Sequence, residues 1–151
     1  MKLNKESENM IPSDMYMEFL KSLGLFPIDN WNQFEAEHQI EMKPKVRNNH
    51  TVKIRNQGKS TSGVYVYFDG ETCLYVGESS NLGDRFKDHY NESWKENPKG
   101  RNYKQFSFFK QYQRPLIVKW IEIEDAFDRK IVEAMLTKIL KPLYEEYKKT
   151  N

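Results

Sequence analysis

Two adjoining apolar stretches joined by a turn signal constrain the fold of this chain most strongly. Residues 64–68 read Val-Tyr-Val-Tyr-Phe and residues 72–76 read Thr-Cys-Leu-Tyr-Val, so both are rich in β-branched and aromatic residues. The dipeptide Asp69-Gly70 between them favours a tight hairpin turn. The sequence therefore predicts an antiparallel hairpin that begins at Gly63 and ends at Gly77.

The segment that follows the hairpin is predicted to be helical. Ser80 or Asn81 can cap a helix from Leu82 to about residue 90, and a polar loop follows over about 91–102. A further helix is expected over residues 103–112, with three aromatic residues pointing inward: Phe106, Phe109 and Tyr112.

Alternating and helical patterns complete the C-terminal half. Residues 116–123 alternate as a strand does, and Asp125 can cap a helix over 126–140 that Pro142 closes. The residues of this helix expected to face the sheet are Phe127, Ile131, Val132, Met135 and Ile139.

The N-terminal part is predicted to be a tail followed by one or two helices. Ser13 is expected to cap a first helix that Gly24 stops. One face of that helix carries Met15, Tyr16, Phe19, Leu20 and Leu23, and we expect it to pack against the remaining domain. A weaker second helix is expected after Asn30, with Trp31 and Phe34 as anchors.

The predicted fold class is α/β (α+β), a compact domain with a small, mainly antiparallel sheet flanked by helices and a helical N-terminal extension. We divide the chain into an extension over 1–60, a domain over 61–145 and a tail over 146–151. A chain of 151 residues suffices for one such domain. The extension includes a basic stretch in which Val52 and Ile54 could form a short edge strand.

Composition favours a folded protein of the reducing cytoplasm. Aromatic residues make up 14%, and no apolar run approaches the length of a membrane span, so no membrane partner is expected. The single cysteine, Cys73, excludes an internal disulfide and a cysteine-based zinc site within one chain.

The net charge of +2 does not by itself indicate a nucleic-acid partner, but the distribution of charge is uneven. Residues 43–59 hold six Lys and Arg and no acid, and residues 95–114 hold six against one Glu. Clustered cations can neutralise phosphates, although charge alone is more typical of two solvated loops. The candidate DNA-binding residues are Lys53, Arg55, Lys59, Lys87, Lys99, Arg101 and Lys104.

The two strands of the hairpin carry paired tripeptides, Gly-Val-Tyr at 63–65 and Tyr-Val-Gly at 75–77. Arg85 follows ten residues after Tyr75, His89 lies one helical turn later, and Glu133 lies within the late helix. Together these residues resemble the GIY-YIG nuclease superfamily, with Val in place of Ile in both tripeptides. The resemblance covers about residues 62–144.

The resemblance implies a catalytic set of Tyr65, Tyr75, Arg85, His89 and Glu133. Glu133 would hold one Mg²⁺ (or Mn²⁺) per active site, since such hard ions prefer oxygen ligands. Arg85 would fork onto the scissile phosphate. Tyr65 would act as general base or orient the attacking water, which for a base would require its pKa to fall well below 10. Each residue alone fits an ordinary packing or surface role, and the set together favours the enzyme.

The expected function is a metal-dependent DNA endonuclease, restriction-like or of phage or mobile-element type, since the chain has no room for a large targeting domain. Such an enzyme is expected in the cytoplasm of a bacterial or phage-infected cell. The alternative is a catalytically inactive nucleic-acid-binding module of the same fold, and a third reading is a protein-binding role for the N-terminal helices. The family often places Asn shortly after the proline that ends the glutamate helix, whereas Leu143, Tyr144 and Glu145 follow Pro142 here. Breaking both DNA strands would call for a homodimer or two successive cuts.

Overall fold

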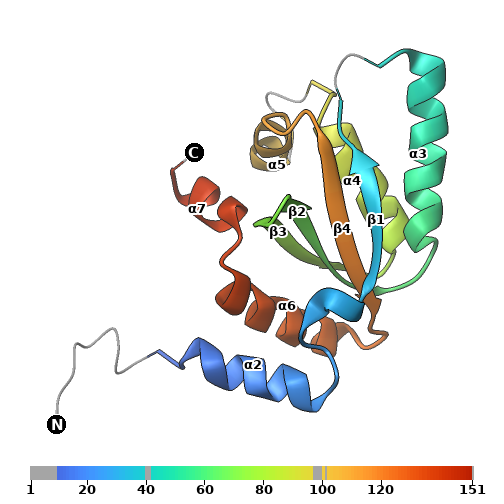
Figure 1. Ribbon diagram of the computed structural model, residues 1–151. Coiled ribbons are helices and arrows are strands. Elements are labelled where there is room, and N and C mark those ends of the chain that lie inside the picture. The colour runs from blue at the N-terminus through green and yellow to red at the C-terminus, as the bar shows by residue number, and fades with distance from the viewer. Residues whose placement is uncertain (1–9, 40–41, 97–99, 101, 151) are drawn as a thin grey trace, which may run out of the picture.

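Four antiparallel strands form the central sheet of the computed structural model, which describes residues 10–39, 42–96, 100 and 102–150 (Figure 1). Their order across the sheet is β1-β4-β2-β3. The strands are β1 (Asn32–Glu37), β2 (Gly63–Asp69), β3 (Thr72–Ser79) and β4 (Pro115–Glu122). The hairpin β2–β3 is therefore at one side of the sheet, and β4 joins it to β1.

Helices cover both faces of this sheet. Helices α2 (Ser13–Ser22) and α6 (Ala126–Leu140) pack together on one face, and α3 (Pro44–Gly58) packs on α4 (Leu82–Glu92) over the other. The short helices α5 (Tyr103–Phe109) and α7 (Leu143–Thr150) lie near the hairpin end of the molecule, and a 3-10 turn, η1 (Ile28–Asn30), precedes β1. No helix in the described ranges is long and apolar enough to cross a membrane.

Alternation along β2 divides the core into two clusters. Val64 and Val66 pack with Leu20 and Leu136 on the α2–α6 side, whereas Tyr65 and Tyr67 join the cluster beneath α4 and α5. Residues 64–67 are all fully buried. The strand is thus enclosed on both faces, and the face beneath α4 and α5 is the aromatic one.

Gly63 begins β2 because β4 approaches too closely for a side chain. A Cβ at this position would collide with the backbone carbonyl of Ile121, which a neighbouring strand cannot withdraw without breaking its ladder. The first residue of the Gly-Val-Tyr tripeptide is therefore explained by packing.

The predicted hairpin, antiparallel sheet and late helix are confirmed. Asn81, one of the two candidate caps, accepts a hydrogen bond from the Asp84 amide at 3.0 Å, and Asp125 accepts one from the Asp128 amide at 2.9 Å. Gly24 takes the left-handed backbone expected of a helix stop, with φ of +72°.

Two expectations for the N-terminal part were wrong. Trp31 and Phe34 do not anchor a second helix, because Phe34 lies in β1 opposite Val118 and this part of the chain completes the sheet. The segment with Val52 and Ile54 is helix α3 and not an edge strand. Pro44 at the first helical position was the local sequence signal for this helix. The helix is stabilised by burial of Ile54 in the aromatic cluster.

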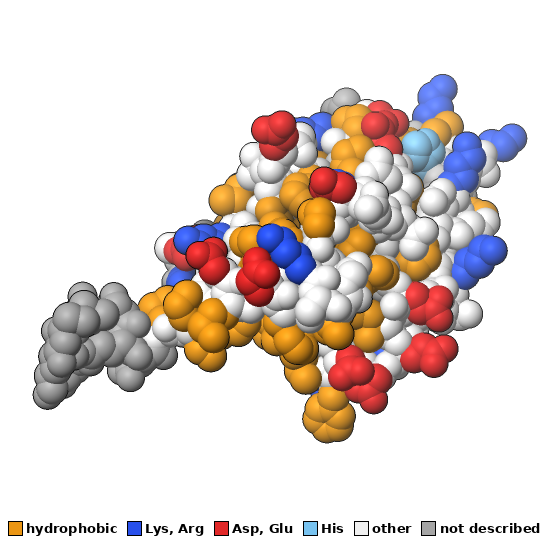
Figure 2. Space-filling view, turned by 60° about the horizontal axis from the view of Figure 1, so that its bottom comes forward, with side chains coloured by type: hydrophobic (Ala, Val, Ile, Leu, Met, Phe, Trp, Pro, Cys, Tyr) orange, Lys and Arg blue, Asp and Glu red, His pale blue; other side chains and the backbone are white. Residues whose placement is uncertain are grey.

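The buried helix faces also differ from those expected. In α2 only Leu20 is buried, while Met15, Phe19 and Leu23 are exposed. In α6 the buried residues are Arg129, Val132 and Leu136, whereas Phe127 and Ile131 are exposed. In α5 they are Phe108 and Phe109 and not Phe106. Figure 2 shows hydrophobic side chains gathered on the α2–α6 side of the molecule.

Ser13 begins α2 but does not cap it. Its hydroxyl donates to the Lys138 carbonyl at 3.4 Å, and the helix has no side-chain cap. The Ser13 hydroxyl, which the sequence predicted to accept a hydrogen bond from an amide of α2, is thus bonded to α6.

Candidate active site

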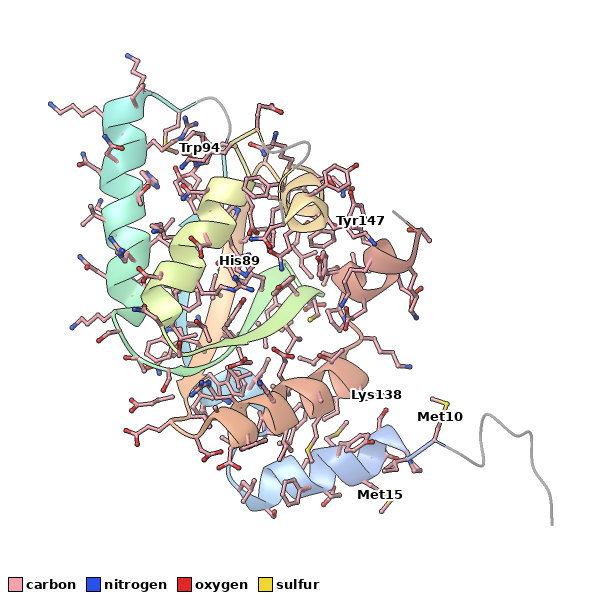
Figure 3. All side chains as sticks on the ribbon, turned by 180° about the vertical axis from the view of Figure 1, so that it is seen from behind. Met10, Met15, His89, Trp94, Lys138 and Tyr147 are labelled. Atoms are coloured by element: carbon pink, nitrogen blue, oxygen red, sulfur yellow. The ribbon has the colours of Figure 1, made fainter. Side chains whose placement is uncertain are left out.

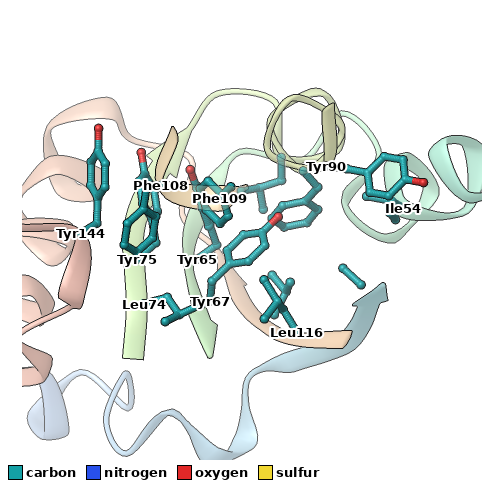
Figure 4. Close-up of a cluster of buried hydrophobic side chains, with 14 residues drawn as sticks. Ile54, Tyr65, Tyr67, Leu74, Tyr75, Tyr90, Phe108, Phe109, Leu116 and Tyr144 are labelled. Carbon is teal, nitrogen blue, oxygen red and sulfur yellow. The ribbon is translucent and has the colours of Figure 1, made fainter. Parts of the chain in front are cut away.

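The two tyrosines of the paired tripeptides face the same side of the hairpin. Tyr65 lies opposite Gly77, and Tyr75 lies opposite Tyr67, so the two candidate residues are diagonal neighbours. Their rings are nearly parallel, with centroids 6.0 Å apart and an interplanar angle of 16°. Figure 4 shows both hydroxyls pointing the same way, toward the helices that cover this face.

Gly77 is required because the Tyr65 ring lies directly over it. A Cβ at position 77 would collide with the hydroxyl oxygen and the ring carbon that bears it. The last residue of the Tyr-Val-Gly tripeptide therefore makes room for the first tyrosine, and it links the two halves of the motif physically.

Helix α4 brings two further candidate residues to the Tyr65 hydroxyl. Arg85 and His89 are four residues apart and share one face of the helix. Nε2 of His89 lies 2.6 Å from the Tyr65 hydroxyl oxygen, and Nε of Arg85 donates to that oxygen at 3.4 Å. Figure 3 places His89 between α4 and the hairpin. Three of the five predicted catalytic residues thus meet at one oxygen atom.

Burial keeps both tyrosines in their neutral form in the free protein. It raises the pKa of Tyr65 well above 10, neighbouring Tyr75 raises it further, and the Arg85 charge opposes the rise. Burial likewise raises the pKa of Tyr75, against the opposing charge of Arg85. The lowered Tyr65 pKa that a phenolate base would need is therefore absent from this arrangement.

Tyr75 has partners on α5 and α7 that the sequence did not reveal. The Gln105 side-chain amide donates to the Tyr75 hydroxyl at 3.0 Å, and the Tyr144 ring packs on Tyr75 with centroids 4.9 Å apart. Tyr144 belongs to the segment after Pro142 in which the family often has Asn. The hairpin is thus supported at this point by aromatic packing and by Gln105.

Glu133 reaches the site from α6, whose orientation is set one turn earlier. Arg129, which is nearly buried, donates to the Glu78 carboxylate of β3 at 2.9 Å and so ties α6 to the hairpin. Glu133 is half-buried, and no side chain in the described part of the chain forms a hydrogen bond or ion pair with its carboxylate. Burial and the negative charges of Glu78 and Glu145 raise its pKa, against Lys148 and Arg85.

These surroundings suit a divalent cation. A half-buried carboxylate crowded by two others gains stability from a nearby positive charge. Within the described ranges no three His, Cys, Asp or Glu side chains form a metal-binding group. Glu133 would therefore hold an ion as the main protein ligand, with the remaining positions left to water and substrate oxygens, as Mg²⁺ accepts.

Sequence reasoning missed a buried carboxylate beside His89. Nδ1 of His89 lies 2.7 Å from Oε1 of Glu92, and the two side chains are 0% and 1% exposed. The available signal was spacing, because residues three apart share a helix face. His89 is thus bonded at both ring nitrogens.

The candidate DNA-binding residues occupy several elements. Lys53 and Arg55 on α3 and Lys59 just after it are exposed, and Arg55 is held by Asp84 of α4 at 2.6 and 2.9 Å. Lys87 is half-exposed on α4, the next turn after Asp84. Lys104 on α5 donates to the Lys148 carbonyl at 2.9 Å. Lys99 and Arg101 lie outside the described residues.

An α/β domain with this hairpin, helix and late glutamate has the architecture of a small nuclease domain. Residues 61–134, just under half of the chain, match the family model of the GIY-YIG catalytic domain, so this segment is a GIY-YIG nuclease domain, of the class of enzymes that hydrolyse phosphodiester bonds. The resemblance found in the sequence is thereby confirmed.

The solved structures to which the chain is similar include GIY-YIG N-terminal endonuclease domains of UvrC from Thermotoga maritima. A tyrosine-to-phenylalanine mutant of that domain, bound to its catalytic divalent cation, is 21% identical, with a TM-score of 0.46 over 68% of this chain and 98% of that one. The magnesium-bound form is also 21% identical, with a TM-score of 0.45 and the same coverage. No curated protein matches the chain.

Proposed function

We propose that this nuclease is a metal-dependent DNA endonuclease of restriction-like, phage or mobile-element type. The observation that carries the proposal is the convergence of Arg85 and His89 on the Tyr65 hydroxyl, with Glu133 delivered to the same hairpin by α6. A binding module needs no such arrangement, whereas hydrolysis needs a proton acceptor, a phosphate-binding cation and a carboxylate near the reacting atoms.

Tyr65 acts in this proposal as a neutral proton relay. Its hydroxyl is buried in the free protein, and once substrate binding admits the attacking water the hydroxyl oxygen takes a proton from it while its own proton passes to Nε2 of His89, 2.6 Å away. This route avoids a resting phenolate, which burial of Tyr65 opposes. The general-base role expected for Tyr65 is thus shared with His89.

Arg85 is the residue that meets the phosphate. It is half-exposed, so its guanidinium can contact solvent and substrate while Nε remains near Tyr65. The planar group can bind two phosphate oxygens and stabilise the charge that builds up at phosphorus. Arg85 thereby positions the scissile phosphate above Tyr65.

Glu133 would hold a single Mg²⁺ or Mn²⁺ ion. The ion supplies Lewis-acid stabilisation of the phosphate and of the departing 3′ oxygen when bound. Glu133 and Arg85 then approach the phosphate from α6 and α4, on either side of the hairpin.

DNA is the proposed substrate because exposed Lys and Arg side chains lie on the surface next to Arg85, where they can bind further phosphates. Arg55 and Lys87 lie on adjacent helices within one or two turns of the site, and Lys53 and Lys59 extend the same α3 segment. We include Lys99, Arg101 and Lys104 as contacts on the other side. These cations lie both on α4 of the catalytic domain and on α3 of the segment that precedes it, so the chain can hold DNA without a large targeting domain, as a restriction-like or mobile-element enzyme would. Breaking both strands would require a homodimer or two successive cuts.

The test is incubation of the purified protein with supercoiled plasmid in Mg²⁺. We expect nicked or linear DNA, no reaction in EDTA, and loss of at least about 100-fold in rate for Glu133→Gln and Arg85→Ala. Glu96→Gln is the matched control, because Glu96 is 82% exposed and its substitution removes the same charge.

Two outcomes would contradict the proposal. Full activity in both site variants would overturn the residue assignment. Salt-sensitive DNA binding without any cleavage, in Mg²⁺ or Mn²⁺ and on several DNA forms, would favour an inactive binding module.

A further inference from the structure

We propose that Glu92 is a positioning residue that acts through His89, and that it fixes the ring form of His89 able to receive the Tyr65 proton. The inference rests on the proposed function, because it concerns the proton relay of that reaction. Glu92 lies outside the set of residues that the tripeptides and the late helix define.

The geometry is a continuous buried chain of three polar groups. The Glu92 carboxylate is 2.7 Å from Nδ1 of His89, and Nε2 of His89 is 2.6 Å from the Tyr65 hydroxyl. The exposed fractions of Glu92, His89 and Tyr65 are 1%, 0% and 0%. Water therefore does not compete for either hydrogen bond in the free protein.

The chemistry of Glu92 selects one tautomer of His89. An ionised carboxylate can only accept hydrogen bonds, so the ring proton belongs on Nδ1, where it donates to Glu92. Nε2 then carries a lone pair and accepts the Tyr65 hydroxyl. In the opposite tautomer the Nδ1 lone pair would face the carboxylate at 2.7 Å, which is repulsive.

Glu92 also stabilises the state that follows proton transfer. The water O–H bond breaks, and the water oxygen forms the new bond to phosphorus while the bond from phosphorus to the 3′ oxygen breaks. The electron pair of that bond stays on the 3′ oxygen, which takes a proton from solvent to leave as a hydroxyl group. The water proton moves to Tyr65, and the Tyr65 proton moves to Nε2, so His89 becomes an imidazolium beside Glu92. This proton returns to solvent after product release, which restores the starting forms.

Aromatic rings surround most of the His89 ring. Tyr67 and Tyr75 of the hairpin and Phe109 of α5 have ring centroids 5.3, 4.7 and 4.8 Å away. His38, after β1, and Arg85 are the nearby groups that can carry positive charge. Glu92 is the carboxylate bonded to the ring, so it is the group placed to offset a charge on His89 most directly.

A purely structural role explains the His89–Glu92 pair poorly. Both residues belong to α4, three positions apart, so their bond does not join separate elements. Burying a carboxylate is costly unless it is paired, and a local pair on an exposed face would avoid that cost. The buried pair contacts Tyr65 on β2, and a role in proton transfer from Tyr65 explains why it is buried there.

The test compares Glu92→Gln with wild type in two measurements. Glutamine keeps the shape but loses the charge, and its amide can donate to Nδ1 as well as accept from it. We expect ¹⁵N NMR to show Nδ1–H at His89 in wild type and a shift toward Nε2–H in the variant. Single-variant spectra assign the signals of the three histidines. Single-turnover cleavage should fall about 10- to 100-fold with DNA affinity unchanged.

Controls separate charge loss from damage to the fold. Glu96→Gln should change neither the tautomer nor the rate. Glu92→Asp keeps the carboxylate, so it should retain Nδ1–H and cleave faster than Glu92→Gln, and it serves if the glutamine variant does not fold.

The failure of this inference differs from the failure of the proposed function. An Nε2–H tautomer in wild type, or an undiminished cleavage rate in folded Glu92→Gln, overturns the role of Glu92 alone. A wild-type protein that cleaves no DNA overturns the proposed function, and the NMR measurement still decides whether Glu92 sets the ring form of His89.

Discussion

The position and protonation of each side chain at the site are determined mainly by the residues that contact it. The Tyr65 hydroxyl meets His89 and Arg85, and the absence of a side chain at Gly77 makes room for its ring. The same aromatic cluster contains His38, which is fully buried, and neither of its ring nitrogens has a hydrogen-bond partner in the described part of the chain. Its protonation therefore opposes folding.

Stability should depend on pH through His38. Burial and the neighbouring His89 lower the pKa of His38 from 6.5 to about 3. Between these values the unfolded chain binds more protons than the folded one, so stability is complete above pH 6.5 and falls as pH decreases toward 3. The slope approaches about 1.4 kcal/mol per pH unit.

Chemical denaturation at pH 4, 5, 6 and 7 measures this slope. His38→Leu removes the titrating group at similar volume, so we expect its stability to depend less on pH than that of the wild type. Identical slopes in the two proteins would show that His38 does not titrate as its burial implies.

Elements of the site are joined by close contacts at a few points. Gly77 lets the Tyr65 ring cross β3, Arg129 ties α6 to Glu78, and the Asn81 cap fixes where α4 begins. These contacts determine which turn of each helix faces the hairpin. The positions of the site residues on α4 and α6 relative to the hairpin therefore depend on these contacts.

Gly77→Ala should disturb the hairpin and displace Tyr65. The added methyl group overlaps the Tyr65 ring, and we expect a loss of about 1–3 kcal/mol in unfolding free energy together with reduced cleavage. Thermal or urea unfolding measures the first effect, and the plasmid assay measures the second.

Gly70→Asn is the control for that substitution. Gly70 has a positive φ of 60°, which Asn tolerates, and nothing lies within 4 Å of a Cβ there. Stability and activity of this variant should stay near wild type. A Gly77→Ala protein as stable and active as the control would contradict the close packing of Tyr65 on β3.

The whole molecule has two unlike sides. Exposed cations of α3 lie on the side of the sheet that carries the catalytic cluster, whereas exposed apolar residues of α2 and α6 lie on the opposite side (Figure 2). The basic stretch of the sequence thus becomes a helix beside α4, next to Arg85.

Charge reversal on α3 should weaken DNA binding. For Lys53→Glu with Lys59→Glu we expect a loss of about tenfold or more in affinity, and a salt dependence reduced by about two ions. Lys138→Glu with Lys141→Glu is the matched control, since each pair has one exposed helical lysine and one exposed lysine with φ near 50°. Equal affinity of the two double variants at moderate salt would remove α3 from the DNA-binding surface.

Local patterns in the sequence determined the hairpin, the caps at Asn81 and Asp125, and the family, because turn residues, capping side chains and short motifs act over a few positions. The tertiary structure decided what depends on distant partners. Trp31 and Phe34 lie in or beside a strand because β4 offers an edge, and Ile54 lies on a helix because α4 and the aromatic cluster bury it. The inward face of α6 is set by Arg129 meeting Glu78. Glu92 became visible as a partner of His89 only when packing removed water from both, since spacing brings two side chains together but burial decides what their contact can do.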